Sequence, residues 1–289
     1  MKLIINADDF GISRTVNQAI VDGFKNGILT STSIMPNMLA FEDAIRKLKS
    51  IGEIGLGVHL NITEYKSKLR TKEKNSKLYD NEGKFNNNFF QILAKSNDED
   101  FMFEVEHEFR SQIEAVLKYF KPDHLNSHNH VHSIPKIFNL VCKLAKEYEI
   151  PAVRTQYEPF YLTDKFKDKS QWKNWLNKDF YVNFAKREIL KYFTEINRQT
   201  LNKYALKSND CSIGIGYRGM MDSESIIKGI DLIKNSPAIL EVISHPDLNE
   251  QKLANLVEYK SLCDLDMKNY IENFEKISFR NFKKEKIAV

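Results

Sequence analysis

The sequence has few of the residues that mark several common classes of protein. Its three cysteines, Cys142, Cys211 and Cys263, lie far apart and form no CxxC pair. This odd and scattered set excludes a disulfide framework, and we expect small buried thiols in a reducing compartment. No run of about 18 apolar residues occurs, so the sequence predicts no transmembrane helix and no membrane partner. The apolar stretch at residues 3–5 is too short for a signal peptide, and we expect a cytoplasmic protein.

The chain also lacks a strong excess of charge of one sign. Its 43 basic and 39 acidic residues are interspersed, and the only tight basic cluster is FRNFKKEK at residues 279–286. This pattern shows no nucleic-acid footprint. Hydrophobic residues make up 42% and charged residues 28% of the chain, which is typical of a globular protein. We therefore expect residues 1–289 to form a single folded domain with one large core.

Short apolar runs alternate along the chain with patterns of helical spacing. About eight runs are typical of strands, and they cover residues 3–5, 30–36, 54–62, 123–128, 152–155, 211–217, 238–246 and 277–282. Amphipathic helices are predicted at residues 15–27, 40–50, 134–148, 223–235 and 250–263. This repeated β-α order predicts a parallel sheet covered by helices, and it favours a (β/α) barrel or a distorted relative of one.

The stretch DHLNSHNHVH at residues 123–132 contains four of the seven histidines. His128, His130 and His132 stand at every second position, so in an extended strand they would point to one side. A buried imidazole needs partners for both ring nitrogens, so three imidazoles on one face indicate a metal or catalytic site. The alternative is a polar loop that is rich in histidine without such a site.

Further polar side chains stand at the ends of the other predicted strands. They are Asp8 and Asp9 in NADDFG, His59 in GVHLN, Arg154 in VRT and His245 in SHPD. The carboxyl ends of parallel strands lie on the same side of a sheet, so these groups should meet in one cleft. A single histidine is more often a core residue than a ligand, but five strand ends with polar groups form a joint pattern.

These residue types predict the chemistry of a metal-dependent hydrolase. One carboxylate and two imidazoles suit Zn²⁺ or another divalent ion and leave positions open for water and substrate. The second carboxylate could accept the proton of the water as general base. Arg154 could hold that base ionised, and His245 could protonate a leaving amine.

The motifs NADDFGIS, GLGVHLNIT, HLNSHNHVHSIP and EVISHPD resemble, in this order, those of the YdjC-like carbohydrate deacetylases, the family of the chito-oligosaccharide deacetylase. The resemblance runs through nearly the whole chain. It implies a distorted (β/α) barrel like that of the polysaccharide deacetylases, a bound divalent metal ion (Mg²⁺ or Zn²⁺), and removal of acetyl groups from N-acetylated sugars such as diacetylchitobiose. It also suggests a homodimer.

The same resemblance implies a role for each site residue. Asp9, His59 and His128 would be the metal ligands, Asp8 the base and His245 the acid. We expect His130, His132 and Asn61 to contact the substrate.

Two insertions interrupt the alternating pattern, at residues 62–100 and 156–182, and both leave from the carboxyl side of strands. The first is polar, and we expect part of it to be disordered. The second carries both tryptophans, Trp172 and Trp175, among other aromatic residues. These aromatics could stack on sugar rings or pack on the core of their own loop.

Two other functions fit parts of the pattern. Metal-dependent phosphoesterases and amidohydrolases also use HxH motifs on barrel folds, but they carry HxH on the first strand, whereas this first strand carries two aspartates. A non-catalytic sugar-binding relative would be expected to lack one of the chemical groups, and none is missing.

Overall fold

Eight short parallel strands form one sheet in the computed structural model, which describes residues 1–68, 76–167 and 178–283. Across the sheet the order is β5-β4-β3-β2-β1-β7-β6, and β8 pairs with β1. The strands are β1 Lys2–Phe10, β2 Ser31–Ile34, β3 Gly55–Leu60, β4 His124–Ser127, β5 Ala152–Val153, β6 Cys211–Ile213, β7 Ile239–Ser244 and β8 Glu275–Lys276. The central strands are buried on both faces, which explains their continuous apolar runs.

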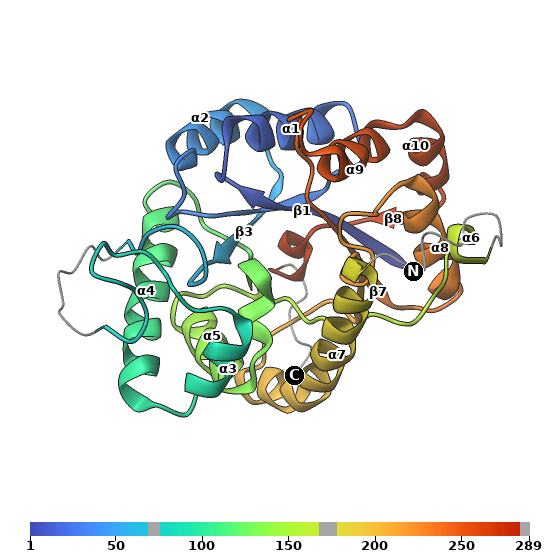
Figure 1. Cartoon of the computed structure of the whole chain (residues 1–289). Coiled ribbons are helices and arrows are strands. Elements are labelled where there is room, and N and C mark those ends of the chain that lie inside the picture. Colours follow the sequence, from blue (N-terminus) through green and yellow to red (C-terminus); the bar gives the residue numbers. More distant parts are fainter. Residues whose placement is uncertain (69–75, 168–177, 284–289) are drawn as a thin grey trace.

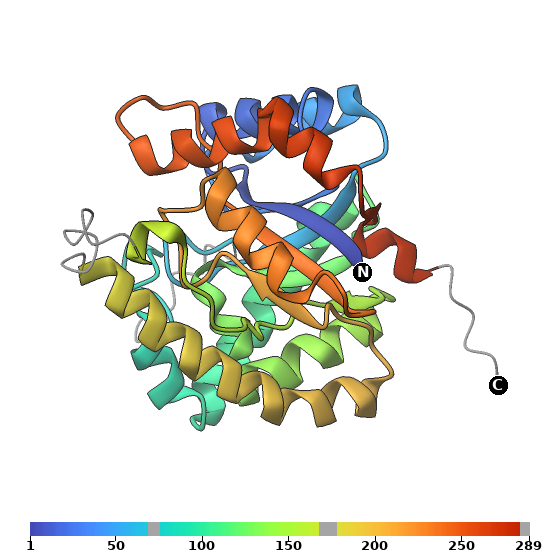
Figure 2. The ribbon, with the colours of Figure 1, turned by 90° about the vertical axis from the view of Figure 1, so that its right-hand side faces the viewer.

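Helices surround the sheet in two groups. Figures 1 and 2 show α1, α2, α9 and α10 on one side and α4, α5 and α7 on the other. The bounds are α1 Arg14–Lys25, α2 Phe41–Ile51, α3 Phe89–Lys95, α4 Glu99–Leu117, α5 Pro135–Glu147, α6 Asp164–Lys167, α7 Lys178–Tyr204, α8 Ser223–Ile233, α9 Leu253–Cys263 and α10 Leu265–Ile271, with 3-10 helices η1 His128–Ser133 and η3 Phe279–Lys283. Together they form a single α/β domain.

The sheet is curled, and its two edge strands approach each other without forming a complete barrel. Asn209, just before β6, bridges to Thr155, just after β5: its Oδ1 accepts the Thr155 N–H (2.9 Å) and its Nδ2 donates to the Thr155 carbonyl (3.0 Å). The Ser212 N–H of β6 also donates to the Tyr157 carbonyl (2.9 Å). The predicted distorted barrel is therefore confirmed as a curled, open parallel sheet.

The prediction of a strand at residues 277–282 is wrong. The strand β8 ends before it at Lys276, and Phe279–Lys283 form the 3-10 helix η3. Phe279 and Phe282 are both buried, against Ile4 and Ala152 among others. Their spacing of three residues places both rings on one face of a 3-10 helix, and a strand would point them to opposite faces.

The described part of the first insertion packs on the main core, and the expectation that another part is disordered stays a prediction. Leu78, Tyr79, Phe85 and Ile92 are all buried in the main core. Residues 69–75 lie outside the described part of the chain.

Three described aromatic residues of the second insertion, Tyr161, Phe166 and Phe180, are buried in the core, whereas Phe160 and Tyr181 are more than half exposed. The Phe166 ring stacks on Phe180 (centroids 4.2 Å apart) and contacts Tyr217. Trp172 and Trp175, for which stacking on sugars and packing on the core were both open, lie outside the described residues.

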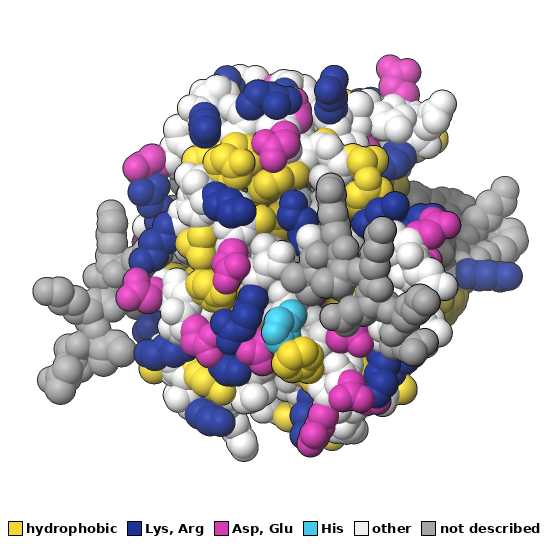
Figure 3. Space-filling view, turned by 90° about the vertical axis from the view of Figure 1, so that its left-hand side faces the viewer, with side chains coloured by type: hydrophobic (Ala, Val, Ile, Leu, Met, Phe, Trp, Pro, Cys, Tyr) yellow, Lys and Arg dark blue, Asp and Glu magenta, His cyan; other side chains and the backbone are white. Residues whose placement is uncertain are grey.

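The surface carries both signs of charge. Figure 3 shows Lys and Arg side chains interspersed with Asp and Glu side chains over one face of the molecule. Among the described residues, no helix is both long enough and apolar enough to cross a bilayer.

Candidate metal site

The predicted polar residues come from the carboxyl ends of neighbouring strands. Asp8 and Asp9 end β1, His59 lies near the end of β3, His128 follows β4, Arg154 follows β5 and His245 follows β7. Because β1, β3, β4 and β7 are parallel members of one sheet, residues from distant parts of the sequence converge there.

A β-bulge separates the two aspartates. The register between β1 and β2 runs from Ala7 opposite Thr32 to Phe10 opposite Ile34, so Asp8 and Asp9 share one partner position. Asp9 also has a left-handed backbone (φ 66°), which is uncommon for a residue with a side chain and is found most often at functional sites. The bulge re-aims the two carboxylates, so adjacent residues take different partners.

Asp9, His59 and His128 form a compact set of possible metal ligands, with one ligand atom of each within 4.8 Å of the others. Asp9 Oδ1 lies 2.9 Å from His128 Nδ1 and 3.4 Å from His59 Nε2. The Asn126 side-chain amide lies 2.7 Å from His59 Nδ1 and fixes the ring. The opposite nitrogen, His59 Nε2, is buried and has no hydrogen-bond partner among the described residues. A buried nitrogen facing a carboxylate in this way fits a divalent ion between them.

Asp8 belongs to a separate network around Arg154. Its Oδ2 accepts from Arg154 Nη1 (2.7 Å) and its Oδ1 from Arg154 Nη2 (2.9 Å) and Ser33 Oγ (2.8 Å). Burial alone would raise the pKa of Asp8, but the Arg154 guanidinium, followed by His59, outweighs burial and holds the pKa far below its ordinary value. Asp8 is therefore ionised at every working pH.

Sequence reasoning missed Glu241, which lies on the other side of Arg154. The fully buried Arg154 donates from Nη2 (2.6 Å) and Nε (2.9 Å) to Glu241 Oε1. Two carboxylates thus fix one guanidinium in place. A signal was present in AILEVIS, where one charged residue interrupts an apolar strand, because such a residue is buried only with a partner.

The histidine tract is not a strand, so the expectation that three imidazoles share one face is wrong. The strand β4 ends at Ser127, and residues 128–133 form η1, in which Asn129 (φ 54°) and His130 (φ 62°) are left-handed. Only His128 reaches the triad. His132 is fully buried, with Nδ1 2.6 Å from Ser127 Oγ and Nε2 3.2 Å from the Arg154 carbonyl. His130 Nδ1 contacts the Gln156 side chain.

Asn61 is engaged inside the turn that follows β3. Its Oδ1 accepts the backbone N–H groups of Thr63 (3.0 Å) and Glu64 (3.1 Å), and its Nδ2 donates to the Glu64 carbonyl (2.7 Å). These bonds hold Glu64, which sequence reasoning also missed. Glu64 Oε1 lies 3.2 Å from His128 Nε2, on the ring edge opposite Asp9.

His245 is held at its backbone and left open at its ring. Its N–H donates to Glu258 Oε2 (2.5 Å) and its carbonyl accepts from Asn255 Nδ2 (2.6 Å). The buried ring nitrogen Nδ1 has no hydrogen-bond partner among the described residues. Burial, helped by the positive charge of Arg218, lowers the pKa of His245 to about 4.

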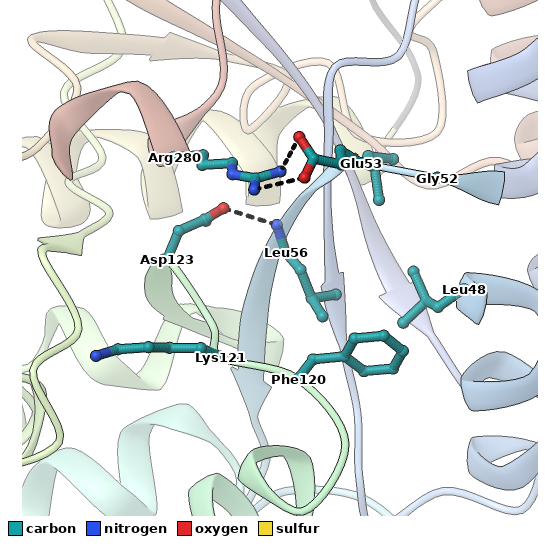
Figure 4. Close-up of a pocket in the computed structure, with 9 residues that line it drawn as sticks. Leu48, Gly52, Glu53, Leu56, Phe120, Lys121, Asp123 and Arg280 are labelled. Atoms are coloured by element: carbon teal, nitrogen blue, oxygen red, sulfur yellow. Dashed lines mark hydrogen bonds and ion pairs between the residues drawn. The ribbon is translucent and has the colours of Figure 1, made fainter. Parts of the chain in front are cut away.

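A pocket of about 370 Å³ lies at the other end of the strands and holds no comparable set of groups. Figure 4 shows it beside Leu56, at the start of β3, and Asp123, just before β4. Asp123 Oδ2 accepts the Leu56 N–H (2.9 Å), and Arg280 pairs with Glu53 (2.9 Å). Its charged groups therefore stabilise the ends of the strands.

A family model described as YdjC-like protein matches residues 2–273 of the chain. A carbohydrate deacetylase of Clostridium beijerinckii is 44% identical over 153 residues, which cover 52% of this chain and 59% of the relative. One from Halalkalibacterium halodurans is 34% identical over 68% of this chain and 78% of the relative. One from Thermoanaerobacter pseudethanolicus is 25% identical over 94% of both. The first two curated relatives are thus matched over about three fifths of their length, 59% and 58%.

A solved structure from Enterococcus faecalis, described as a candidate cellobiose-phosphate cleavage protein, has the same fold. It superposes with a TM-score of 0.73 over 97% of this chain and 98% of its own, at 23% sequence identity.

Proposed function

The chain belongs to the YdjC-like protein family, and from this membership and its site we propose that it is a metal-dependent carbohydrate deacetylase. Its substrates would be N-acetylated sugars, such as oligosaccharides that contain N-acetylglucosamine, with diacetylchitobiose as an example. The observation that supports this most directly is the buried set of Asp9, His59 and His128 beside an ionised Asp8. The names of the curated relatives agree with it.

Asp9, His59 and His128 would hold the metal ion. One carboxylate and two imidazoles accept either Mg²⁺ or Zn²⁺ and leave positions free. A bound divalent ion supplies a Lewis acid for the acetamide carbonyl and lowers the pKa of water towards about 7.

Glu64 would orient His128 for that ion. Its carboxylate lies 3.2 Å from His128 Nε2, while Nδ1 of the same ring faces Asp9. Histidines that bind metals usually have a carboxylate, carbonyl or water at their second nitrogen, which fixes the ring and raises its basicity. The turn formed by Asn61 places Glu64 there.

Asp8 would accept the proton of the attacking water, and Arg154 would keep Asp8 ionised and oriented. The two hydrogen bonds from Arg154 hold the carboxylate rigidly, and Glu241 holds Arg154. A carboxylate with so low a pKa is a weak base, so Asp8 depends on water that has itself been made more acidic.

His245 would protonate the leaving amine. Its pKa of about 4 in the metal-free protein leaves the ring neutral at pH 7, so it would donate a proton only after receiving one in the same turnover. For His132 and Asn61 we propose structural roles in place of substrate contact, because the protein already occupies the polar atoms described above. His130 stays a proposed substrate contact.

Acetate release from N,N′-diacetylchitobiose tests this function. We expect the purified protein to release acetate, to lose this activity when a chelator removes the metal, and to regain it when Mg²⁺ or Zn²⁺ is added. Undiminished activity in a preparation shown to be free of metal would refute the metal dependence. No acetate from any of a panel of N-acetylated sugars, with metal present, would refute the deacetylase assignment.

A further inference from the structure

A second pocket adjoins the metal site and has no role in the reaction described above. Its volume is about 760 Å³, and it lies between the turn after β3, the start of α3 and one side of α7. Thr63, Glu64 and Asn129 line its inner end. Because Glu64 is 3.2 Å from His128 Nε2, the wall of the metal site is also the wall of this pocket. A molecule bound at the metal can therefore extend into it.

The outer wall is formed by residues 85–91, FNNNFFQ, in which every side chain is an aromatic ring or an amide. No side chain in this stretch carries a charge. The charged lining residues, Glu64 and Lys186, come from other segments, the turn after β3 and the helix α7. An uncharged wall of rings and amides suits a neutral ligand that has both apolar faces and polar edges.

Phe90 is the most exposed aromatic residue of this wall. Its side chain packs edge-on against Phe89 (centroids 5.7 Å apart, 87° between planes), and the residue is still 65% exposed. On α7, Val182 is 64% exposed and lines the same pocket. Exposed apolar side chains that gather in a groove mark a binding surface more often than a chance arrangement.

Two of the amides hold the wall and two retain free donors. The buried Asn87 donates from Nδ2 to the Leu78 carbonyl (3.0 Å), and Asn88 caps α3. Asn86 and Gln91 use their side-chain oxygens within the protein, as acceptors from Asn87 Nδ2 and the Asn88 N–H. Among the described residues, Asn86 Nδ2 and Gln91 Nε2 donate to no acceptor, so they can donate to the hydroxyl groups of a ligand. The wall is thus formed before a ligand binds.

We propose that this pocket binds the sugar ring next to the one whose acetyl group is removed, with Phe90 as its stacking platform. A pyranose ring has apolar C–H faces that stack on an aromatic ring and hydroxyl groups at its edge that pair with amides, which is the chemistry of this wall. The proposal rests on the proposed function and deepens it, because it assigns the residues that hold a second sugar ring.

The test compares a monosaccharide with a disaccharide. Acetate release from N-acetylglucosamine and from N,N′-diacetylchitobiose is measured for the metal-loaded wild type, Phe90→Ala and Phe90→Tyr. Phe90→Ala should raise KM for the disaccharide by roughly 2- to 10-fold, the range for one lost aromatic contact, with kcat nearly unchanged. Phe90→Tyr should restore KM, and the monosaccharide should show no change.

Phe103→Ala is the matched control. Phe103 is also 65% exposed, but it lies on α4 against His107 and does not line the pocket. This variant should leave both substrates unaffected. The subsite is refuted if Phe90→Ala changes KM for neither substrate, or changes KM for both substrates equally. It is also refuted if the wild type releases acetate only from the monosaccharide. In each case the deacetylase function stands.

If the wild type releases acetate from neither sugar, the panel of N-acetylated sugars described above decides on the proposed function, and binding decides on the pocket. Calorimetric titration of N,N′-diacetylchitobiose into wild type and Phe90→Ala supplies this measurement. Binding that Phe90→Ala weakens, and Phe90→Tyr restores, supports a sugar site. No binding, or equal binding to wild type and Phe90→Ala, overturns it.

Discussion

The adjacent side chains of Asp8 and Asp9 have different contacts at the site. Asp9 faces the imidazoles of His59 and His128, whereas Asp8 pairs with the guanidinium of Arg154. A carboxylate that binds a cation must stay on that cation, and a base must be free to take a proton. The two substitutions to asparagine should therefore fail in different ways.

We expect Asp8→Asn to lower kcat by about 10²- to 10⁴-fold while metal affinity stays near that of the wild type. Asp9→Asn should weaken metal binding, and added metal should restore part of its activity. Calorimetric metal titration and acetate release measure both effects, with thermal unfolding as a check that each variant folds. If excess metal rescues Asp8→Asn and fails to rescue Asp9→Asn, the two roles are reversed.

Glu64→Gln should weaken metal affinity by about 10- to 100-fold, because His128 loses the carboxylate at its second nitrogen. The side chain of Glu64 is half exposed and Asp9 remains beside His128, so the thermal stability of the metal-free protein should fall only slightly. Glu149→Gln is the control, because Glu149 is an exposed carboxylate that pairs with Lys121 (2.9 Å). Equal metal affinity in both variants would show that Glu64 does not act on His128.

At the scale of elements, two strained segments place the ligands. The bulge at the end of β1 contains Asp9, and η1 contains two consecutive left-handed residues, Asn129 and His130. Such conformations cost about 1–3 kcal/mol each, and they persist only where the surrounding structure holds them. Both segments lie at the metal site, and the regular strands before them supply the rigid support.

The strand β3 approaches β4 too closely for a side chain at Gly57. A Cβ atom there would lie 2.3 Å from His124 Nε2, and His124 is buried against Phe279 (centroids 4.1 Å apart). Gly57→Ala should therefore lower the free energy of unfolding by about 1–3 kcal/mol. Because His59 lies on the same strand, metal affinity should fall as well.

Gly216→Ala is the matched control for Gly57→Ala, since the nearest atom to its Cβ would be 3.4 Å away, an ordinary contact. Chemical unfolding of the two variants and the wild type measures the difference. If Gly57→Ala and the wild type have the same free energy of unfolding, β3 and β4 can move apart without a cost in stability.

At the scale of the whole molecule, metal binding should be linked to stability and to pH. Burial lowers the pKa of His128, but the Asp9 and Glu64 carboxylates outweigh burial and raise it to about 9 in the metal-free protein. The unfolded value is about 6.5. The ion pair of His128 therefore stabilises the metal-free fold fully below about pH 6.5, and this contribution is lost as the pH rises through about 9.

A metal ion must displace the proton of His128, so its effect should have the opposite pH dependence. Between about pH 6.5 and 9 we expect the unfolding temperature of the metal-free protein to fall and the increase produced by added metal to grow. Thermal unfolding with and without metal across this interval measures both trends. If added metal raises the unfolding temperature by the same amount at both ends of the interval, metal binding displaces no proton from His128.

The sequence alone determined the class of fold and the strand ends at which the site is built. Hydrophobic periodicity is a local property, so β1 to β7 and helices such as α1, α5 and α8 could be predicted from short windows. The rule that parallel strands end on one side of a sheet then placed the polar side chains of five strand ends in one cleft, and the family resemblance selected Asp9, His59 and His128 among them.

The tertiary structure decided which partner each of these residues has. Arg154 pairs with Asp8 and Glu241, which are 146 and 87 residues away in the sequence, and no local pattern encodes such a contact. The histidine tract looked like one face of a strand, but the chain turns at Ser127 and sends His128 to the triad and His132 to the Arg154 carbonyl. Periodicity predicts which segments form strands and helices, whereas a hydrogen bond between buried groups depends on how distant segments pack, and only the folded chain brings these segments together.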